Sequence, residues 1–81
     1  MDFKTVMIRA AADEPKAMMK LRANRNKHPV AWKVLENFVI HRYKRKTGKV
    51  IGGEGFDWET VLEWIKLMMP IILKLIMLLF V

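Results

Sequence analysis

The residue types that could carry catalysis or hold a metal ion are few in this chain and stand far apart. The two histidines, His28 and His41, are separated along the sequence, and the chain contains no cysteine. Neither histidine has a second metal ligand at a spacing typical of a zinc site. The only serine or threonine residues are Thr5, Thr47 and Thr60, and none forms a recognisable pair with a histidine and a carboxylate. We therefore expect no enzyme, no metal and no cofactor.

Two other patterns look like sites but lack what such sites need. Glu59 and Glu63 are one helical turn apart. At the start of an apolar helix, such a pair is typical of a cap and of an ion pair with a neighbouring chain. The glycine-rich segment 52–55 lacks the lysine and hydroxyl residue of a phosphate-binding loop. It is interpreted as a hinge.

Length and charge narrow the class of protein further. A chain of 81 residues forms a small core at best, and without cysteines it has no disulfides to support it. Residues 1–50 hold thirteen Lys and Arg against four Asp and Glu, a net charge of +9, whereas residues 51–81 have a net charge of −2. This asymmetry in net charge indicates a basic binding part joined to a different kind of segment.

The first residues contain no apolar run of the length that a signal peptide needs, so no signal peptide is expected.

The spacing of apolar residues predicts an all-α protein. Apolar residues recur at helical spacing over residues 2–12, from Pro15 to about residue 23, and from Pro29 to about residue 46. A proline in the first turn favours a helix start, and Gly48 is placed to end the third helix. A fourth helix is expected to follow Asp57, an N-cap residue. We predict a basic helical region over residues 1–48, a hinge over 49–55 and a hydrophobic helix over 56–81.

The C-terminal segment carries the main functional prediction. Residues 61–81 are almost entirely apolar. A helix of this length spans roughly 31 Å, close to the ~30 Å thickness of a bilayer's hydrocarbon core. Insertion of its apolar residues outweighs the cost of one central lysine, so the sequence predicts a transmembrane helix. Phe56, Trp58 and Trp64 lie at its entrance, where aromatic residues collect at a membrane surface.

The polar residues of this helix fall in one narrow stripe. At 100° per residue, one side of the helix carries all of its charged residues together with Pro70, namely Glu59, Glu63, Lys66 and Lys74. The stripe predicts packing with a second copy or with another membrane chain, where Lys74 meets a carboxylate or a carbonyl group of the neighbour. Two alternatives are a helix lying in the membrane interface and a helix buried in a large soluble assembly.

The cations form two clusters. The first comprises Lys16, Lys20, Arg22, Arg25 and Lys27, and the second comprises Arg42, Lys44, Arg45, Lys46 and Lys49. A basic cluster before a membrane segment favours the cytoplasmic side and binds acidic lipid head groups. The same clusters could bind nucleic acid or remain a solvated surface.

These patterns together predict a non-enzymatic structural or scaffold protein. It would be located in a host or virion membrane, with its basic part on the cytoplasmic or interior side. Its partners would be membrane lipid and either further copies or other membrane or capsid chains, and nucleic acid is an alternative partner of the basic part. A minor membrane protein of a virus particle and an accessory subunit of a membrane complex both suit the pattern. The alternative is a soluble interaction subunit whose apolar helix is buried in a large assembly, with or without nucleic acid.

Overall fold

A computed structural model of the chain describes residues 2–80, and the elements of this part are all helical. The helices follow one another without an intervening strand, which confirms the predicted all-α class. Their bounds are α1 Phe3–Ala10, α2 Pro15–Ala23, α3 Pro29–Thr47 and α4 Trp58–Leu79. The first and last residues of each helix lie within two residues of the predicted bounds.

Local sequence signals set the helix ends. The Asp2 carboxylate accepts a hydrogen bond of 2.8 Å from the backbone N–H of Thr5, which caps α1. Pro15 and Pro29 are the first residues of α2 and α3, as proline in a first turn favours. Gly48 ends α3 with a φ of 75°, a conformation that favours glycine, and its N–H donates to the Lys44 carbonyl oxygen over 2.8 Å.

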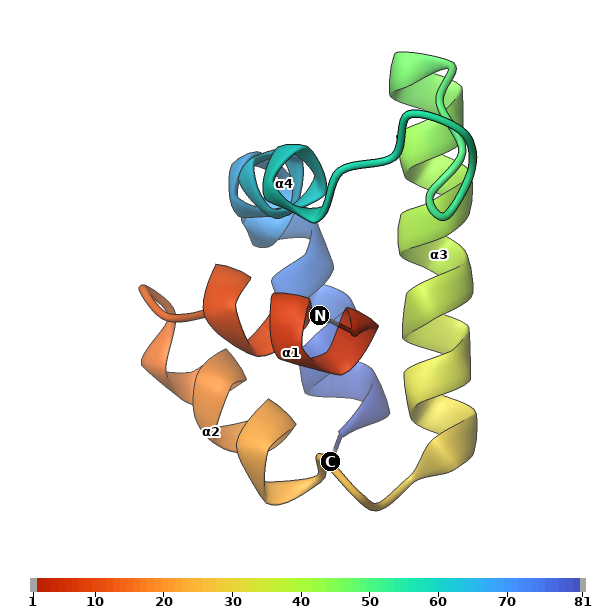
Figure 1. Cartoon of the computed structure of the whole chain (residues 1–81). Helices are drawn as coiled ribbons and strands as arrows, with labels where there is room; N and C mark the ends of the chain where they lie inside the picture. Colours follow the sequence, from red (N-terminus) through yellow and green to blue (C-terminus); the bar gives the residue numbers. More distant parts are fainter. Residues whose placement is uncertain (1, 81) are drawn as a thin grey trace.

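The C-terminal helix α4 lies at the centre of the fold. Figure 1 shows α1, α2 and α3 arranged around it, and all three contact it. Its buried side chains are Val61, Leu62, Ile65, Met69, Ile72 and Ile76. They share one apolar core with residues of the other helices, among them Met7 of α1, Leu21 of α2 and Leu35 of α3. The helix predicted to face lipid therefore supplies the core of a folded domain.

Pro70 lies inside α4, on its exposed side. Proline has no N–H to donate to the preceding turn, and its ring pushes against that turn, so a helix bends at this residue. In Figure 1 the first turns of α4 are seen almost end-on and the last turns run across the view. The bend lets one long helix follow the surface formed by the three shorter ones.

The structure corrects the prediction of a transmembrane helix. Within residues 2–80, no helix is both long enough and apolar enough to cross a membrane. The physical reason is charge. A membrane-spanning helix needs about 18 consecutive residues with few or no charges, and every stretch of 18 residues within α4 includes Glu63, Lys66 and Lys74. The predicted span ran to residue 81, which lies outside the described part of the chain.

The segment between α3 and α4, which the sequence predicts to be a hinge, has a backbone that favours glycine at two positions. Gly52 and Gly55 have φ values of 88° and 75°, which residues with a side chain rarely adopt. The division into residues 1–48, 49–55 and 56–81 remains a prediction. The shared core nevertheless means that the basic helices and α4 stabilise one another.

Candidate anion-binding surface

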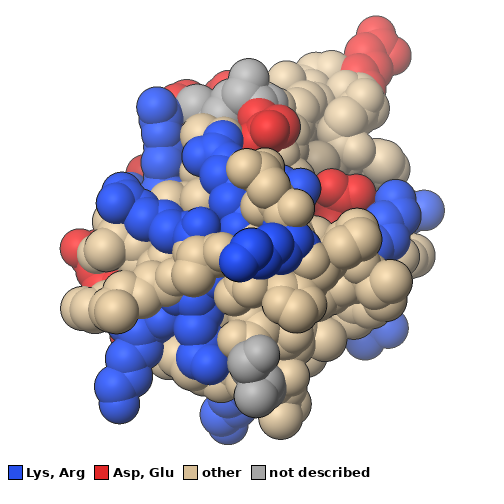
Figure 2. Space-filling view, turned by 90° about the horizontal axis from the view of Figure 1, so that it is seen from below, with Lys and Arg blue, Asp and Glu red and all other residues tan. Residues whose placement is uncertain are grey.

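The first basic cluster lies on α2 and on the connection that follows it. Lys16, Arg22 and Lys27 are exposed, and within residues 2–80 they have no hydrogen-bond or ion-pair partner. Figure 2 views the molecule from the end where α2 finishes and α3 begins, and Lys and Arg side chains predominate over acidic ones there. These three cations are available to an external anion.

The other two members of this cluster also have contacts inside the protein. The Lys20 ammonium group donates a hydrogen bond of 3.2 Å to the carbonyl oxygen of Phe80, just after the last turn of α4. A cation is favoured at a helix C-terminus because carbonyl groups there lack helical partners. The Arg25 guanidinium donates to the Thr5 hydroxyl over 2.8 Å. Part of the predicted surface therefore also joins helices to one another.

Exposed apolar side chains lie among these cations. Met19 of α2 is 68% exposed, and Val30 in the first turn of α3 is 76% exposed. Val34 follows one turn after Val30 and is 45% exposed. An exposed methionine or valine costs free energy in water. Their position beside free cations gives this surface both charged and apolar groups.

The second basic cluster lies at the other end of α3. Lys44, Arg45, Lys46 and Lys49 are exposed, whereas Arg42 is half-buried. The Arg42 guanidinium carbon lies 5.8 Å from the centre of the Phe38 ring. Both residues line an open hollow of about 280 Å³, which is completed by Asn37, His41 and Arg45.

The two clusters do not meet. The first precedes the start of α3 at Pro29, whereas the second begins at Arg42 and surrounds the end of the helix at Thr47 (Figure 1). The part of α3 between Pro29 and Arg42 is about 20 Å long at ~1.5 Å per residue. The structure therefore offers two separate basic surfaces, joined along α3 by exposed residues that include Lys33 and His41.

The predicted polar stripe of α4 lies on its exposed face. Glu59, Glu63, Lys66 and Lys74 are all exposed, and Lys66 pairs with Glu63 over 3.6 Å. Beside this stripe runs an apolar strip that the sequence analysis did not identify. Its members are Leu67, 79% exposed, Ile71, 40% exposed, and Leu78, 73% exposed.

The three predicted interfacial aromatics are half-buried and contact other rings. Phe56 and Trp58 meet at 4.7 Å between centroids. Trp64 meets Tyr43 of α3 at 5.3 Å. These contacts pack the start of α4 against the hinge and α3, so the rings already have a structural role inside the protein.

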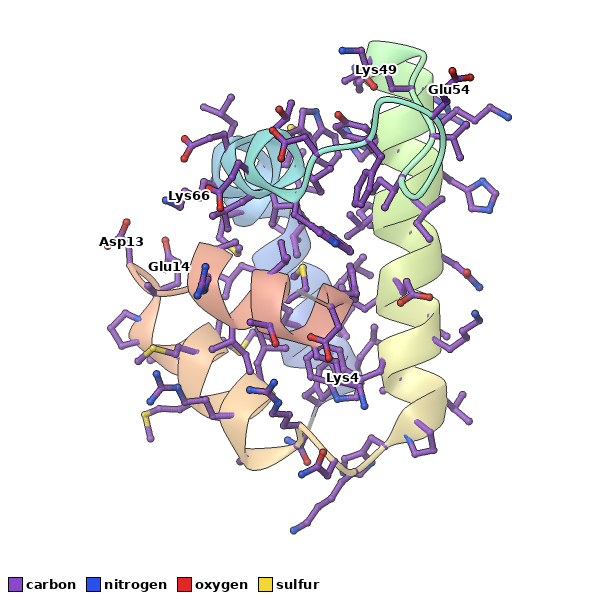
Figure 3. The ribbon with its side chains drawn as sticks, in the orientation of Figure 1. Lys4, Asp13, Glu14, Lys49, Glu54 and Lys66 are labelled. Atoms are coloured by element: carbon purple, nitrogen blue, oxygen red, sulfur yellow. The ribbon has the colours of Figure 1, made fainter. Side chains whose placement is uncertain are left out.

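Carboxylates are dispersed in the part of the chain that the structure describes. Asp13 and Glu14 lie at the turn between α1 and α2, whereas Glu54 lies near Lys49 at another corner of the molecule (Figure 3). Residues 2–80 contain no group of three or more His, Cys, Asp or Glu side chains close enough together to hold a metal ion.

The pKa of the Asp2 carboxyl is lowered by its hydrogen bonds with Thr5. The hydrogen bond with the Thr5 side chain has the larger effect, and the one with the Thr5 backbone follows.

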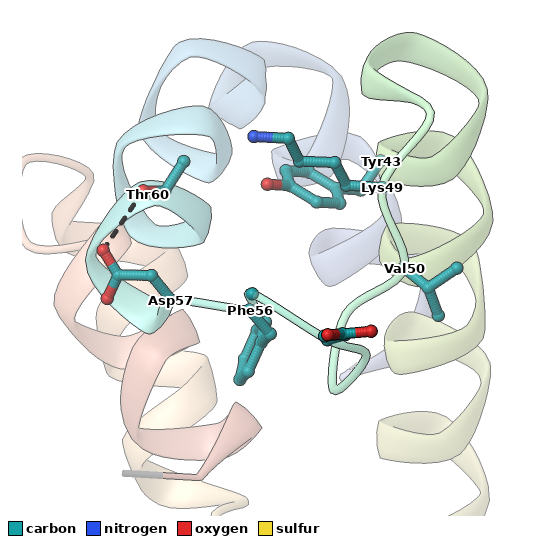
Figure 4. Close-up of a pocket in the computed structure, with 8 residues that line it drawn as sticks. Tyr43, Lys49, Val50, Phe56, Asp57 and Thr60 are labelled. Atoms are coloured by element: carbon teal, nitrogen blue, oxygen red, sulfur yellow. Dashed lines mark hydrogen bonds between the residues drawn. The ribbon is translucent and has the colours of Figure 1, made fainter.

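A small cavity lies where the hinge meets α3 and α4. Tyr43, Lys49, Phe56 and Asp57 are among its lining residues, and the Thr60 hydroxyl donates to Asp57 across its edge (Figure 4). Its volume is about 30 Å³. A space of this size holds about one water molecule, so it offers no room for an organic substrate.

Sequence reasoning missed the exposed apolar residues and the hollow beside Phe38. A signal for the hollow was present, because Asn37, His41 and Arg45 recur every four residues on one side of a helix. Comparison of the chain with protein-family models, with curated proteins and with solved structures found no match.

Proposed function

We propose that this protein is a non-enzymatic scaffold that binds the surface of an acidic lipid bilayer. The first basic cluster supplies the electrostatic attraction, and copies of the protein associate through α4. Binding is peripheral, because the apolar face of α4 is occupied by the core of the domain. A minor protein of a membrane-containing virus particle or an accessory subunit of a membrane complex would have these properties.

The observation that carries this proposal is the mixture of free cations and exposed apolar side chains at one end of the fold. Lys16, Arg22 and Lys27 have no partner within the described residues, and Met19 and Val30 are more exposed than buried. Cations near an anionic bilayer contribute about 1 kcal/mol each, and apolar side chains enter the boundary between head groups and acyl chains. Nucleic acid would use the cations but would leave Met19 and Val30 in water.

The apolar strip of α4 supports association with a second copy. Leu67 and Ile71 are one turn apart, with Glu63 before them and Lys74 after them. In an antiparallel pair of α4 helices centred between Leu67 and Ile71, Leu67 of each copy meets Ile71 of the other. Glu63 of each copy then lies close to Lys74 of the other. The apolar pairing and the charge pairing thus favour the same alignment.

Flotation of the full-length protein with lipid vesicles tests the membrane proposal. Binding is expected to vesicles that contain phosphatidylserine, and to be weak with phosphatidylcholine alone. Replacing three free cations together (Lys16→Gln, Arg22→Gln and Lys27→Gln) is expected to lower partitioning roughly 100-fold at low ionic strength. Met19→Gln is expected to weaken the part of binding that survives in high salt.

A matched control keeps the charge change and moves its position. Neutralising Lys44, Lys46 and Lys49 removes the same charge from the other end of α3, where the exposed apolar residue is Val50, 49% exposed against 68% for Met19 and 76% for Val30. Its effect on flotation should be smaller. Equal binding to both kinds of vesicle would overturn the preference for acidic lipid. Tight binding to nucleic acid with no flotation would overturn the membrane proposal in favour of the alternative assembly role.

Self-association has its own test, in the absence of lipid. Light scattering after gel filtration is expected to show a species larger than the monomer at high protein concentration. Leu67→Gln should return the protein to a monomer, whereas Met19→Gln should not. A monomer at all concentrations would remove the scaffold part of the proposal and leave lipid binding untouched.

A further inference from the structure

The hollow on α3 has a donor set suited to one class of ligand. Its lining residues are Asn37, Phe38, His41, Arg42 and Arg45, around a volume of about 280 Å³. The polar members offer an amide, an imidazole and two guanidinium groups. None is acidic, so the hollow presents N–H donors and positive charge to its occupant.

Arg42 is the central residue of this site. It is half-buried, and its guanidinium carbon lies 5.8 Å from the Phe38 ring centre. Its Nε atom is buried and has no hydrogen-bond partner among the described residues. The ion pairs found within residues 2–80 are Lys33 with Glu36 and Lys66 with Glu63, so no carboxylate compensates Arg42.

A partly buried guanidinium without a carboxylate partner is costly for a folded protein. The Phe38 ring holds the Arg42 side chain in place, so little rotational freedom remains to be lost on binding. An anion in the hollow would supply the missing charge. Guanidinium groups bind oxygen-rich anions through two parallel hydrogen bonds, which carboxylate and phosphate both accept.

The arrangement of the neighbouring donors distinguishes between these anions. Asn37, His41 and Arg45 are four residues apart and form a row along α3, with Arg42 beside it. Two guanidinium groups match an anion with close to two negative charges. A phosphomonoester has about −1.5 to −2 charge near neutral pH, whereas a carboxylate or a phosphodiester has one.

We infer that this hollow is a site for a phosphomonoester, presented as the head group of a membrane lipid. The inference rests on the proposed membrane function and adds a head-group preference to it. A lipid is favoured over a soluble phosphate because Val34, 45% exposed, lies one turn of α3 before Phe38 and gives the site an apolar margin. The first basic cluster then provides general attraction, and the hollow selects the lipid.

The test uses the full-length protein and two kinds of vesicle matched in surface potential. One kind contains phosphatidic acid, a phosphomonoester, and the other contains phosphatidylserine. Wild-type protein is expected to bind the phosphatidic acid vesicles roughly tenfold more tightly, the effect of one additional charged hydrogen-bonding contact. Arg42→Lys keeps the charge but loses the paired N–H groups, and it is expected to abolish this preference while retaining binding to phosphatidylserine.

Arg45→Gln is the second variant, because Arg45 is exposed and its replacement leaves the core intact. It is also expected to reduce the preference. Lys46→Gln is the matched control, because Lys46 lies next to Arg45 in the sequence but does not line the hollow, and its replacement also removes one charge. It should weaken binding to both kinds of vesicle equally. Circular dichroism confirms that each variant is folded.

Competition separates the head group from the bilayer. Glycerol 3-phosphate is expected to displace the protein from phosphatidic acid vesicles more than sodium chloride at the same ionic strength. No displacement, equal binding of the wild type to both vesicles, or an unchanged preference in both arginine variants would overturn the site. Tight binding of a 5′-phosphorylated oligonucleotide in place of phosphatidic acid would also overturn it. If the wild-type protein bound neither phosphatidic acid vesicles nor phosphatidylserine vesicles, the proposed membrane function itself would be overturned.

Discussion

The rings of Trp32 and Phe80 meet edge to face, with their centroids 4.9 Å apart. Trp32 belongs to α3 in the basic half of the chain, and Phe80 follows the last turn of α4. The Trp32 ring also contacts Phe3 of α1, and its indole N–H donates to the Asn24 carbonyl oxygen over 2.8 Å. Phe80 therefore completes an aromatic cluster that joins the basic helices to the end of α4.

Replacing Phe80 should destabilise the whole domain. Its side chain is almost completely buried, and Phe80→Ala would remove a ring and leave a cavity, at a cost of about 3–5 kcal/mol. For a domain of this size the midpoint of thermal unfolding, Tm, should fall by more than about 10 °C. Thermal unfolding followed by circular dichroism measures the change.

Leu78→Ala is the matched control, because Leu78 lies two residues earlier and is 73% exposed. Its effect on the free energy of unfolding should stay within about 0.5 kcal/mol. If Phe80→Ala and Leu78→Ala gave the same Tm, the end of α4 would not be packed as described.

Removal of α4 should unfold the basic helices. A chain ending at Gly55 would lose all the buried side chains of α4, and with them the surface that α1, α2 and α3 contact. Isolated helices of fewer than about 12–15 residues are marginal in water, which applies to α1 and α2. The longer α3 would lose the apolar surface against which its buried side chains pack. We expect a weak helical signal and no cooperative thermal transition from residues 1–55.

The opposite result for the shortened chain would be equally informative. A sharp transition with the helical content of the first three helices would mean that the basic region folds alone. It would then support the division at residue 48 as a boundary between independent units, and it would contradict the shared core.

The helices themselves could be predicted from the sequence, because their signals are local. Proline at the first position of α2 and α3, the Asp57 cap and Gly48 each act within one helical turn. The role of α4 could not be predicted in the same way. Its buried apolar residues face the other three helices, and an apolar stretch facing protein has the same composition as one facing lipid.

The candidate surfaces depended on packing in the same way. Sequence identified both basic clusters, but the length of α3 keeps them apart, and that separation follows only from the fold. The exposure of Met19 and Leu67 could not be inferred from their types, because each lies in a helix with buried apolar neighbours. The position of Arg42 against Phe38 was likewise a matter of side-chain packing.

The cap of α4 should contribute measurably to stability. The Asp57 carboxylate accepts hydrogen bonds of 3.2 Å from the Glu59 backbone N–H and from the Thr60 hydroxyl. Asp57→Ala removes these acceptors and should lower the free energy of unfolding by about 1 kcal/mol in urea titration. Glu54→Ala removes the same charge from the hinge without uncapping α4, so it should have a smaller effect. Equal losses would assign the effect to charge alone.

The cap of α1 should make stability depend on pH in the acid range. Hydrogen bonds from the Thr5 side chain and backbone lower the pKa of Asp2 below its usual value. A carboxyl whose pKa is lower in the folded chain stabilises the fold when it is ionised, and this contribution is lost as the pH falls through the folded pKa. The loss should therefore begin below about pH 4, the ordinary range of an aspartate.

Asp2→Asn isolates this contribution, because asparagine also caps helices but has no charge to lose. Between about pH 5 and pH 2, the Tm of the wild type should fall further than that of the variant. The remaining carboxylates are the same in both proteins, so their protonation shifts both curves together. Parallel curves would mean that the hydrogen bonds from Thr5 do not favour the ionised form of Asp2, and that the cap of α1 acts without its charge.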